Sequence, residues 1–288
     1  MTPFKSSFTV DVECGISITM RDLYGVEMKP TERVVHNTNR ILGLLEKKGI
    51  SGTFFTLGIV AETYPALVKR IAAKGHELGV HGYHHYEFDR MDRKQAFREL
   101  DSAKKRIEDL SGKPVFGHRA PAFSINPQTE WGLDLISEAG FTYDSSIVPI
   151  NSGRYGWPGF NPDIHEITTP GGHSLIEVPL ISTRFFFWEI PACGGRYFQI
   201  LPYTYTKHIM EKTIRERPAI VYMHPYEIDE EPYPEYYHEQ LRKAGLRKQV
   251  LTRLRWMNRN SFYPKLDRLT SDFEFAPLCE ILNLGQEV

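Results

Sequence analysis

The stretch His76-Glu-Leu-Gly-Val-His-Gly-Tyr-His-His85 holds four of the 11 histidines of this 288-residue chain and joins an apolar strand pattern to a glycine-containing loop. Before it, residues 64–74 carry apolar side chains at helical spacing, and Gly75 is placed to end that helix in a left-handed conformation. A helix that leads within one residue into a buried strand is typical of alternating α/β structure.

The alternation continues in both directions along the chain. Further strands are expected over residues 8–13, 51–58, 114–120, 141–148 and 218–224, and further helices over residues 31–48, 92–110, 127–139 and 203–217. Short links between them predict a parallel sheet covered by helices, either open or closed as a barrel. Residues 151–203 show no clear helix pattern and are expected to form loops and short strands, and a basic helix is expected over residues 240–258.

Composition limits the partners that the chain can have. It contains 35 Lys and Arg against 36 Asp and Glu, a formal net charge of −1, and 41% apolar residues, which excludes disordered and coiled-coil classes. The balanced charge argues against nucleic acid or an anionic membrane as the main partner. Three scattered cysteines do not make a disulfide framework, and no apolar run reaches the ~18 residues of a membrane span. The sequence therefore favours a small neutral ligand and a cytoplasmic location.

Polar residues gather where the predicted strands end. The side chains at or just beyond these ends are Asp11, Glu13, His81, His85, Arg119, Asp144 and His224. In α/β barrels the carboxyl ends of the strands form the face that carries the chemistry.

His81 and His85 are four residues apart, so a turn in the loop would point both imidazoles at one divalent metal. A carboxylate from another strand end would be the third ligand. Two histidines and one carboxylate leave open positions for water, as in hydrolytic metal sites. The competing interpretation is that both are ordinary histidines of a surface loop.

The order of the motifs adds to this interpretation. Four segments, in chain order, resemble the successive motifs of the polysaccharide deacetylases, the NodB-homology enzymes of carbohydrate esterase family four: Asp11-Val-Glu13, His81-Gly-Tyr-His-His85, Arg119-Ala-Pro121 and Val221-Tyr-Met-His224-Pro225. The resemblance covers roughly residues 8–230. Residues 194–203 and 224–229 look like the subgroup found in exopolysaccharide and exosortase loci, which carries a C-terminal extension.

The resemblance implies a distorted (β/α) barrel of about seven parallel strands over residues 1–230. The loop-rich residues, about 151–203, would be an insertion in it, and residues 231–288 a helical extension packed on the barrel. It also implies the removal of the N-acetyl group from an N-acetylhexosamine unit of a bacterial surface polysaccharide or its precursor, with release of acetate. Alternatives are hydrolysis of another C–N bond, such as a formamide or cyclic amide, and an inactive glycan-binding relative. Neither nucleic acid nor a membrane span is expected, and the oligomeric state stays open.

The resemblance also assigns roles to residues. Glu13, His81 and His85 would hold the metal, zinc first, with cobalt, manganese or iron(II) as alternatives. Asp11 would be the general base, paired with and oriented by Arg119. The backbone N–H of Ala122 would stabilise the oxyanion, and His224 would protonate the departing amine.

Two departures from the family pattern leave alternatives open. The common pair of adjacent aspartates is replaced by Asp11-Val-Glu13, and Cys14 follows where the subgroup often has an aspartate, so a thiolate ligand is an alternative. The family's fourth motif normally supplies an aspartate that tunes the acid histidine, and this sequence matches that motif only loosely. Asp144, Glu227 and Asp229 are all candidates, and Asp144 is included among the expected catalytic residues.

Overall fold

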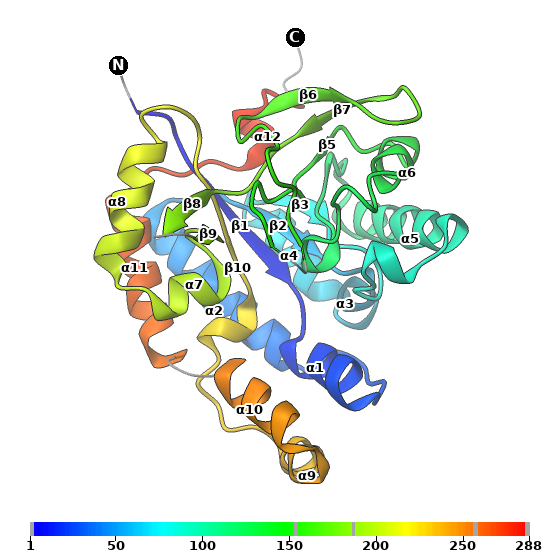
Figure 1. Ribbon diagram of the computed structural model, residues 1–288, viewed down its shortest axis with the longest axis vertical. Coiled ribbons are helices and arrows are strands. Elements are labelled where there is room, and N and C mark those ends of the chain that lie inside the picture. Colours follow the sequence, from blue (N-terminus) through cyan, green and yellow to red (C-terminus); the bar gives the residue numbers. More distant parts are fainter. Residues whose placement is uncertain (1–2, 153–154, 186–187, 256–258, 286–288) are drawn as a thin grey trace.

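An eight-stranded sheet forms the centre of the computed structural model, which describes residues 3–152, 155–185, 188–255 and 259–285 (Figure 1). The strand order is β10-β1-β2-β3-β4-β5-β7-β6. The first seven of these strands run parallel and β6 pairs antiparallel with β7. In the described part of the chain no ladder joins β10 to β6, so the sheet is a curled, incompletely closed barrel. The expected α/β barrel with about seven parallel strands is confirmed.

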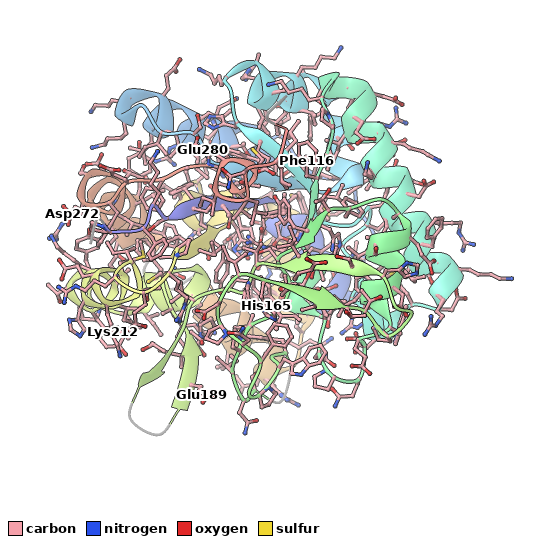
Figure 2. All side chains as sticks on the ribbon, turned by 90° about the horizontal axis from the view of Figure 1, so that it is seen from above. Phe116, His165, Glu189, Lys212, Asp272 and Glu280 are labelled. Carbon is pink, nitrogen blue, oxygen red and sulfur yellow. The ribbon has the colours of Figure 1, made fainter. Side chains whose placement is uncertain are left out.

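The strands of this sheet are short, and most are buried on both faces. They are β1 (Ser7–Val12), β2 (Thr53–Thr56), β3 (Glu77–Val80), β4 (Gly117–His118), β5 (Tyr143–Asp144), β6 (His165–Thr168), β7 (Ser174–Glu177) and β10 (Ile220–Met223). A separate hairpin consists of β8 (Ser182–Phe185) and β9 (Trp188–Pro191). Figure 2 shows this hairpin, marked by Glu189, reaching beyond the rest of the molecule in that view.

Helices surround the sheet. They are α1 (Gly15–Tyr24), α2 (Arg33–Lys48), α3 (Gly58–Thr63), α4 (Pro65–Ala73), α5 (Arg93–Ser111), α6 (Gly132–Glu138), α7 (Gly195–Ile200), α8 (Tyr203–Thr213), α9 (Glu235–Lys243), α10 (Leu246–Arg255), α11 (Phe262–Asp272) and α12 (Leu278–Ile281). None of the helices in the described ranges is long and apolar enough to cross a membrane.

Local sequence signals fix the ends of the long helices. Helix α5 begins after Asp92, whose side chain accepts a hydrogen bond from the N–H of Gln95, and ends at Gly112 with φ of 66°. Helix α2 ends in the same way at Gly49, also with φ of 66°. Glycine adopts this left-handed conformation without the steric cost of a Cβ. The expected helices over 31–48, 64–74 and 92–110 are therefore confirmed.

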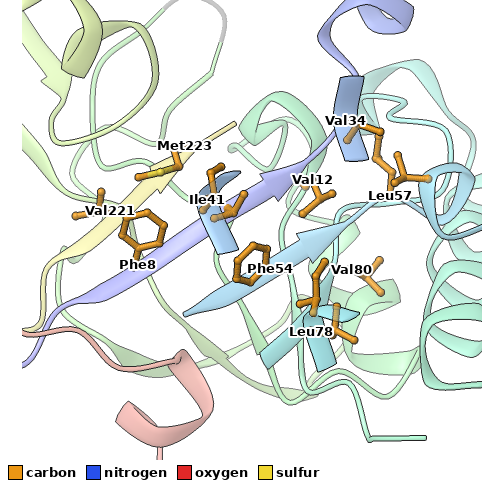
Figure 3. Packing of buried hydrophobic residues seen from close by; sticks show 14 of the residues in the cluster. Phe8, Val12, Val34, Ile41, Phe54, Leu57, Leu78, Val80, Val221 and Met223 are labelled. Atoms are coloured by element: carbon orange, nitrogen blue, oxygen red, sulfur yellow. The ribbon is translucent and has the colours of Figure 1, made fainter. Parts of the chain in front are cut away.

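The main core lies between the strands and α2 (Figure 3). Phe8 of β1, Phe54 of β2 and Ile41 of α2 are completely buried, and Val221 of β10 is 1% exposed. Burying a side chain of this size stabilises the fold by about 1.5–3 kcal/mol. This packing holds β10, β1 and β2 together, and polar residues lie at the carboxyl ends of β10 and β1.

Some predicted elements are wrong. The short strands expected over residues 151–203 are present as β6 to β9, but the same segment also contains helix α7, which was not expected. The single basic helix expected over 240–258 is two helices, because the chain breaks at Ala244 and Gly245, where glycine disfavours a helix interior. Helices α1 and α3 were not expected at all.

The C-terminal residues pack onto the sheet. Phe262, Leu266 and Leu269 of α11 are completely buried. Phe275 forms an isolated parallel β-bridge with Ser6, the residue before β1. The centroid of its ring lies 5.7 Å from that of Phe8. This part of the chain therefore contributes to the hydrophobic core beside β1.

Candidate active site

The carboxyl ends of three strands bring the predicted site residues to one cleft. Strand β1 lies between β10 and β2, and β3 follows β2, so the ends of β10, β1 and β3 share an edge of the sheet. The cleft at this edge has a volume of about 370 Å³. Six of the predicted site residues line it: Asp11, Glu13, His81, His85, Ala122 and His224.

Glu13, His81 and His85 form the one cluster among the described residues that could hold a metal ion. One ligand atom from each lies within 4.8 Å of the others, and all three side chains are buried. Glu13 Oε2 lies 2.8 Å from His85 Nε2 and 3.4 Å from His81 Nε2. Burial alone would raise the pKa of Glu13, but the two imidazoles outweigh it and hold this pKa well below its usual range.

This donor set fits a divalent metal. Glu13 Oε2 is buried and lies close to both Nε2 atoms, but neither contact has the direction of a hydrogen bond, although buried carboxylate oxygens are normally satisfied. His81 Nδ1 lies 2.8 Å from the backbone oxygen of Arg119. A ligating histidine commonly donates its other ring N–H to such an acceptor, which leaves Nε2 for the metal.

The loop that carries both histidines is held from two sides. Glu99 of α5 accepts hydrogen bonds from the backbone N–H groups of Tyr83, at 3.2 Å, and of His84, at 2.7 Å. Arg21 of α1 donates to the backbone oxygens of His84 and His85. His85 itself has φ of 64°, a conformation that costs free energy in a residue with a Cβ. Sequence patterns gave no sign of these two supporting residues.

Arg119 pairs with Asp11 inside the protein. Its Nη1 lies 2.9 Å from Asp11 Oδ1 and 2.6 Å from Thr9 Oγ1. Its Nε and Nη2 donate to the backbone oxygen and the Oγ of Ser145, at 3.0 and 2.9 Å, and its guanidinium lies 4.2 Å from the centre of the Phe55 ring. The expected contact between Arg119 and Asp11 is present, and Ser145 completes it.

His224 faces Asp11 across the cleft. Its Nε2 lies 3.8 Å from Asp11 Oδ2, and its Nδ1 lies 3.4 Å from Glu227 Oε1. Glu227 Oε2 also accepts a hydrogen bond from the backbone N–H of His224 at 2.8 Å. Burial would lower the pKa of His224, but the carboxylates of Glu227, Glu13 and Asp11 outweigh it and raise the pKa to about 9.

Two family models match successive parts of the chain. Residues 16–143 match the family model described as polysaccharide deacetylase. These residues belong to the polysaccharide deacetylase family. Residues 145–283 match a second model, a domain of unknown function named DUF3473. Residues of both matched segments therefore line the cleft: His81 and His85 belong to the deacetylase segment, and His224 belongs to the second segment.

Two peptidoglycan deacetylase relatives match only part of the chain. The peptidoglycan deacetylase-like protein FGM2 of Gibberella zeae is 36% identical over 110 residues, which cover 38% of this chain and 32% of that protein. The peptidoglycan deacetylase of Helicobacter pylori is 35% identical over 109 residues, which cover 38% of this chain and 36% of that protein. This chain thus spans about a third of the length of these relatives.

Solved structures share the fold over nearly the whole chain. A Mycobacterium smegmatis protein described as a polysaccharide deacetylase has a TM-score of 0.61 and 20% identity, covering 99% of this chain and 93% of that one. The allantoinase Puue has a TM-score of 0.62 and 16% identity, covering 97% and 89%. Because both identities are low and the two names differ, these structures establish the polysaccharide deacetylase fold and not the reaction.

The structure corrects the acid expected to tune His224. Asp144 lies on β5, with four strands of the sheet order between it and β10. Its Oδ1 lies 2.7 Å from His118 Nδ1 and accepts a hydrogen bond from Ser146 Oγ at 2.7 Å. Asp229 accepts from Arg33 at 3.0 Å. Among the three candidates, Glu227 is the one beside His224, and the prediction of Asp144 is wrong.

The remaining predicted residues of the deacetylase domain have clear positions. Ala122 lines the cleft in the short 3₁₀ helix η2 (Pro121–Phe123), with φ of 52°. Two residues before it in the chain, the backbone N–H of Ala120 donates a hydrogen bond to Ser146 Oγ at 2.7 Å. Cys14 is buried with its Sγ 3.5 Å from Thr31 Oγ1, and it is not a member of the Glu13 cluster, so the thiolate alternative finds no support.

Proposed function

We propose that this chain is a metal-dependent hydrolase that removes the N-acetyl group from an N-acetylhexosamine unit of a bacterial surface polysaccharide or its precursor and releases acetate. The observation that carries the proposal is the convergence of Asp11, Glu13, His81, His85 and His224 on one cleft. The completeness of this set favours turnover over an inactive glycan-binding relative.

Glu13, His81 and His85 would hold the metal, and zinc is the first choice because imidazole and carboxylate ligands suit it. Cobalt, manganese and iron(II) accept the same donors. When bound, such an ion supplies Lewis acidity, which lowers the pKa of water and polarises the amide carbonyl.

Asp11 and Arg119 would act as a unit on the attacking water. Arg119 occupies Asp11 Oδ1 at 2.9 Å, so Oδ2 is the oxygen that faces His224 and the cleft. In this arrangement Oδ2 accepts the proton of the water that attacks the acetyl carbonyl. Arg119 fixes the carboxylate and neutralises its charge in the buried site.

His224 and Ala122 would serve the later part of the reaction. His224 Nε2 faces the cleft beside Asp11, where it can give a proton to the departing amine nitrogen, while Glu227 orients its other ring nitrogen. The backbone N–H of Ala122 is proposed to stabilise the negative charge that develops on the acetyl oxygen. The free amino sugar and acetate are then released.

The walls of the cleft suit a sugar ring. Aromatic side chains line it together with the polar ones: Phe123, Tyr155, Tyr222 and Tyr226. Such rings offer apolar faces and, in tyrosine, a hydroxyl for hydrogen bonding. We place the reaction in the cytoplasm, because all three cysteines are free, as expected of a reducing compartment.

Acetate release from chitin oligosaccharides tests the proposal. The full chain is equilibrated with Zn²⁺ or Co²⁺, its bound metal is measured, and acetate is quantified for the parent, Asp11→Asn and Asp109→Asn. Asp109 is exposed on α5, so the second variant makes the same chemical change away from the cleft.

We expect Asp11→Asn to lower kcat by about 10²–10⁴-fold with metal content unchanged, and Asp109→Asn to match the parent. The proposal fails if metal-loaded protein releases no acetate from any N-acetylated sugar tried, or if Asp11→Asn stays fully active.

A further inference from the structure

Basic residues are concentrated in one part of the chain. Residues 240–266 contain eight Lys and Arg and no Asp or Glu. Since the whole chain carries a formal charge of −1, all other residues together carry −9. The chain therefore contains a strongly cationic segment although its overall charge is balanced. The low net charge of the whole chain does not exclude binding of this segment to an anionic surface.

Helix α10 in this segment exposes apolar side chains among the cations. Leu246 is 76% exposed and Val250 is 46% exposed, and their spacing of four residues puts them on the same face of the helix. Lys243, the last residue of α9, and Arg247 of α10 are also exposed. Of the five large apolar side chains found exposed in the described ranges, three lie on α9 or α10: Tyr236, Leu246 and Val250.

Helices α9 and α10 lie at one end of the molecule, next to α1 and away from the sheet (Figure 1). Lys248 of α10 donates to the backbone oxygen of Leu23, and Thr252 Oγ1 lies 3.1 Å from the hydroxyl of Tyr24. Leu23 lines the cleft that holds the candidate active site. Helix α10 is therefore fixed near the cleft.

We propose that α10 binds an anionic lipid surface. Leu246 and Val250 enter the boundary between headgroups and acyl chains, and the surrounding lysine and arginine side chains pair with the headgroup phosphates. Exposed aliphatic residues next to exposed cations match this chemistry better than they match nucleic acid, which would leave Leu246 and Val250 without an apolar partner. Binding in this way would hold the cleft close to the bilayer surface.

Vesicle binding tests the proposal without any substrate, so its outcome does not depend on the proposed deacetylase activity. The full chain is sedimented with vesicles of 75% phosphatidylcholine and 25% phosphatidylglycerol, and with pure phosphatidylcholine vesicles. The variants are Lys243→Glu/Arg247→Glu, Leu246→Ser/Val250→Ser and, as a matched charge control, Lys94→Glu/Arg98→Glu. The control residues are exposed and four apart on α5.

We expect the parent and the α5 control to bind the anionic vesicles and not the neutral ones, with binding that weakens as salt rises. Each variant of the 243–250 region should lower the partition coefficient, the charge reversal by at least about tenfold, with thermal unfolding unchanged. Equal binding by the charge-reversed variant and the parent would overturn the proposal. So would the absence of vesicle binding, whether or not the parent binds a random-sequence oligonucleotide in the same buffer.

Discussion

Arg119 is the residue on which the contacts of the candidate site converge. Its guanidinium is fully buried and is shared among Asp11, Thr9 and Ser145. A buried charge of this kind is tolerated only when its partners are in place, because removing one leaves an uncompensated charge that costs about 3–5 kcal/mol. The pair with Asp11 was expected because the resemblance to the polysaccharide deacetylases implies it. Ser145 was not predicted, because a serine near a strand end gives no signal of its own.

The partner of His224 could not be predicted from strand ends. Glu227 lies three residues after His224 and reaches it locally through η3 (Pro225–Ile228). Asp144 ends a strand, as Arg119 and His224 nearly do, but the order of strands in the sheet places it beside His118. Sequence order along the chain does not reveal this order in space.

Replacement of Glu227 by Gln tests its role in positioning His224. The amide still accepts the backbone N–H of His224 but loses the negative charge that faces Nδ1. We expect kcat to fall roughly 10–100-fold with KM nearly unchanged, as measured by acetate release. Asp144→Asn is the comparison variant, and after correction for folded fraction it should keep kcat within a few-fold of the parent. Equal losses of kcat in both variants would contradict the assignment.

At the scale of elements, the site depends on how α1 and α5 hold the loop of residues 81–86. Helix α5 was predictable from its capping signals and apolar spacing. Helix α1 was not, because Ile16, Ile18 and Met20 alternate with other residues as in a strand, although all three are buried in the helix. The backbone contacts that Arg21 and Glu99 make with the loop became visible only in the folded chain.

Loss of the Glu99 side chain should weaken metal binding without touching a ligand. Glu99→Ala removes the acceptor for the N–H groups of Tyr83 and His84, so the strained conformation of His85 loses support. We expect the Kd for Zn²⁺, measured with a competing chelator, to rise about 10–100-fold. Glu130→Ala, at an exposed position outside the loop, is the control and should bind as the parent does. An unchanged Kd in Glu99→Ala would show that the loop keeps its metal-binding conformation without Glu99.

At the scale of the whole molecule, residues after 230 complete the core. The backbone N–H of Leu278 donates to Thr53 Oγ1 on β2 at 2.8 Å, and that of Cys279 donates to Glu77 Oε2 on β3 at 2.9 Å. We propose that residues 1–230 form the barrel and residues 231–288 an extension packed on it. Strand β7, from the segment expected to be an insertion over 151–203, belongs to the sheet.

Two leucine substitutions compare the core and surface parts of the C-terminal residues. Leu266→Ala empties a fully buried position on α11, and Leu246→Ala shortens a side chain that is 76% exposed. We expect urea unfolding to show a loss of about 2–5 kcal/mol for the first. The second should stay within about 0.5 kcal/mol of the parent. A small loss for Leu266→Ala would mean that α11 is not part of the cooperative unit.

Stability should fall as the pH drops below neutral, partly because of His76. Burial lowers the pKa of His76 to about 4, and its Nδ1 accepts the N–H of Gly52 at 3.2 Å. An unfolded histidine, with a pKa near ~6.5, binds protons first, so its contribution to stability is present above pH ~6.5 and is lost as the pH falls through about 4.

His76→Asn should flatten this part of the pH dependence. The asparagine oxygen can still accept the N–H of Gly52 but does not titrate, so the drop in unfolding free energy between pH 7 and 5 should be smaller than in the parent. Overall stability should also fall, because the ring lies against Phe54 with centroids 4.9 Å apart. His173→Asn, at an exposed position, should keep the slope of the parent. Identical slopes in His76→Asn and the parent would contradict the explanation.

We propose that Glu13, His81 and His85 bind a catalytic metal. A crystal structure of the full chain equilibrated with Zn²⁺, with anomalous diffraction recorded on both sides of the zinc edge, tests this proposal. We expect one strong peak per chain, at about 2.0–2.2 Å from the Glu13 carboxylate and from one ring nitrogen of each histidine. No peak among these three side chains, or zinc bound only elsewhere, would contradict it.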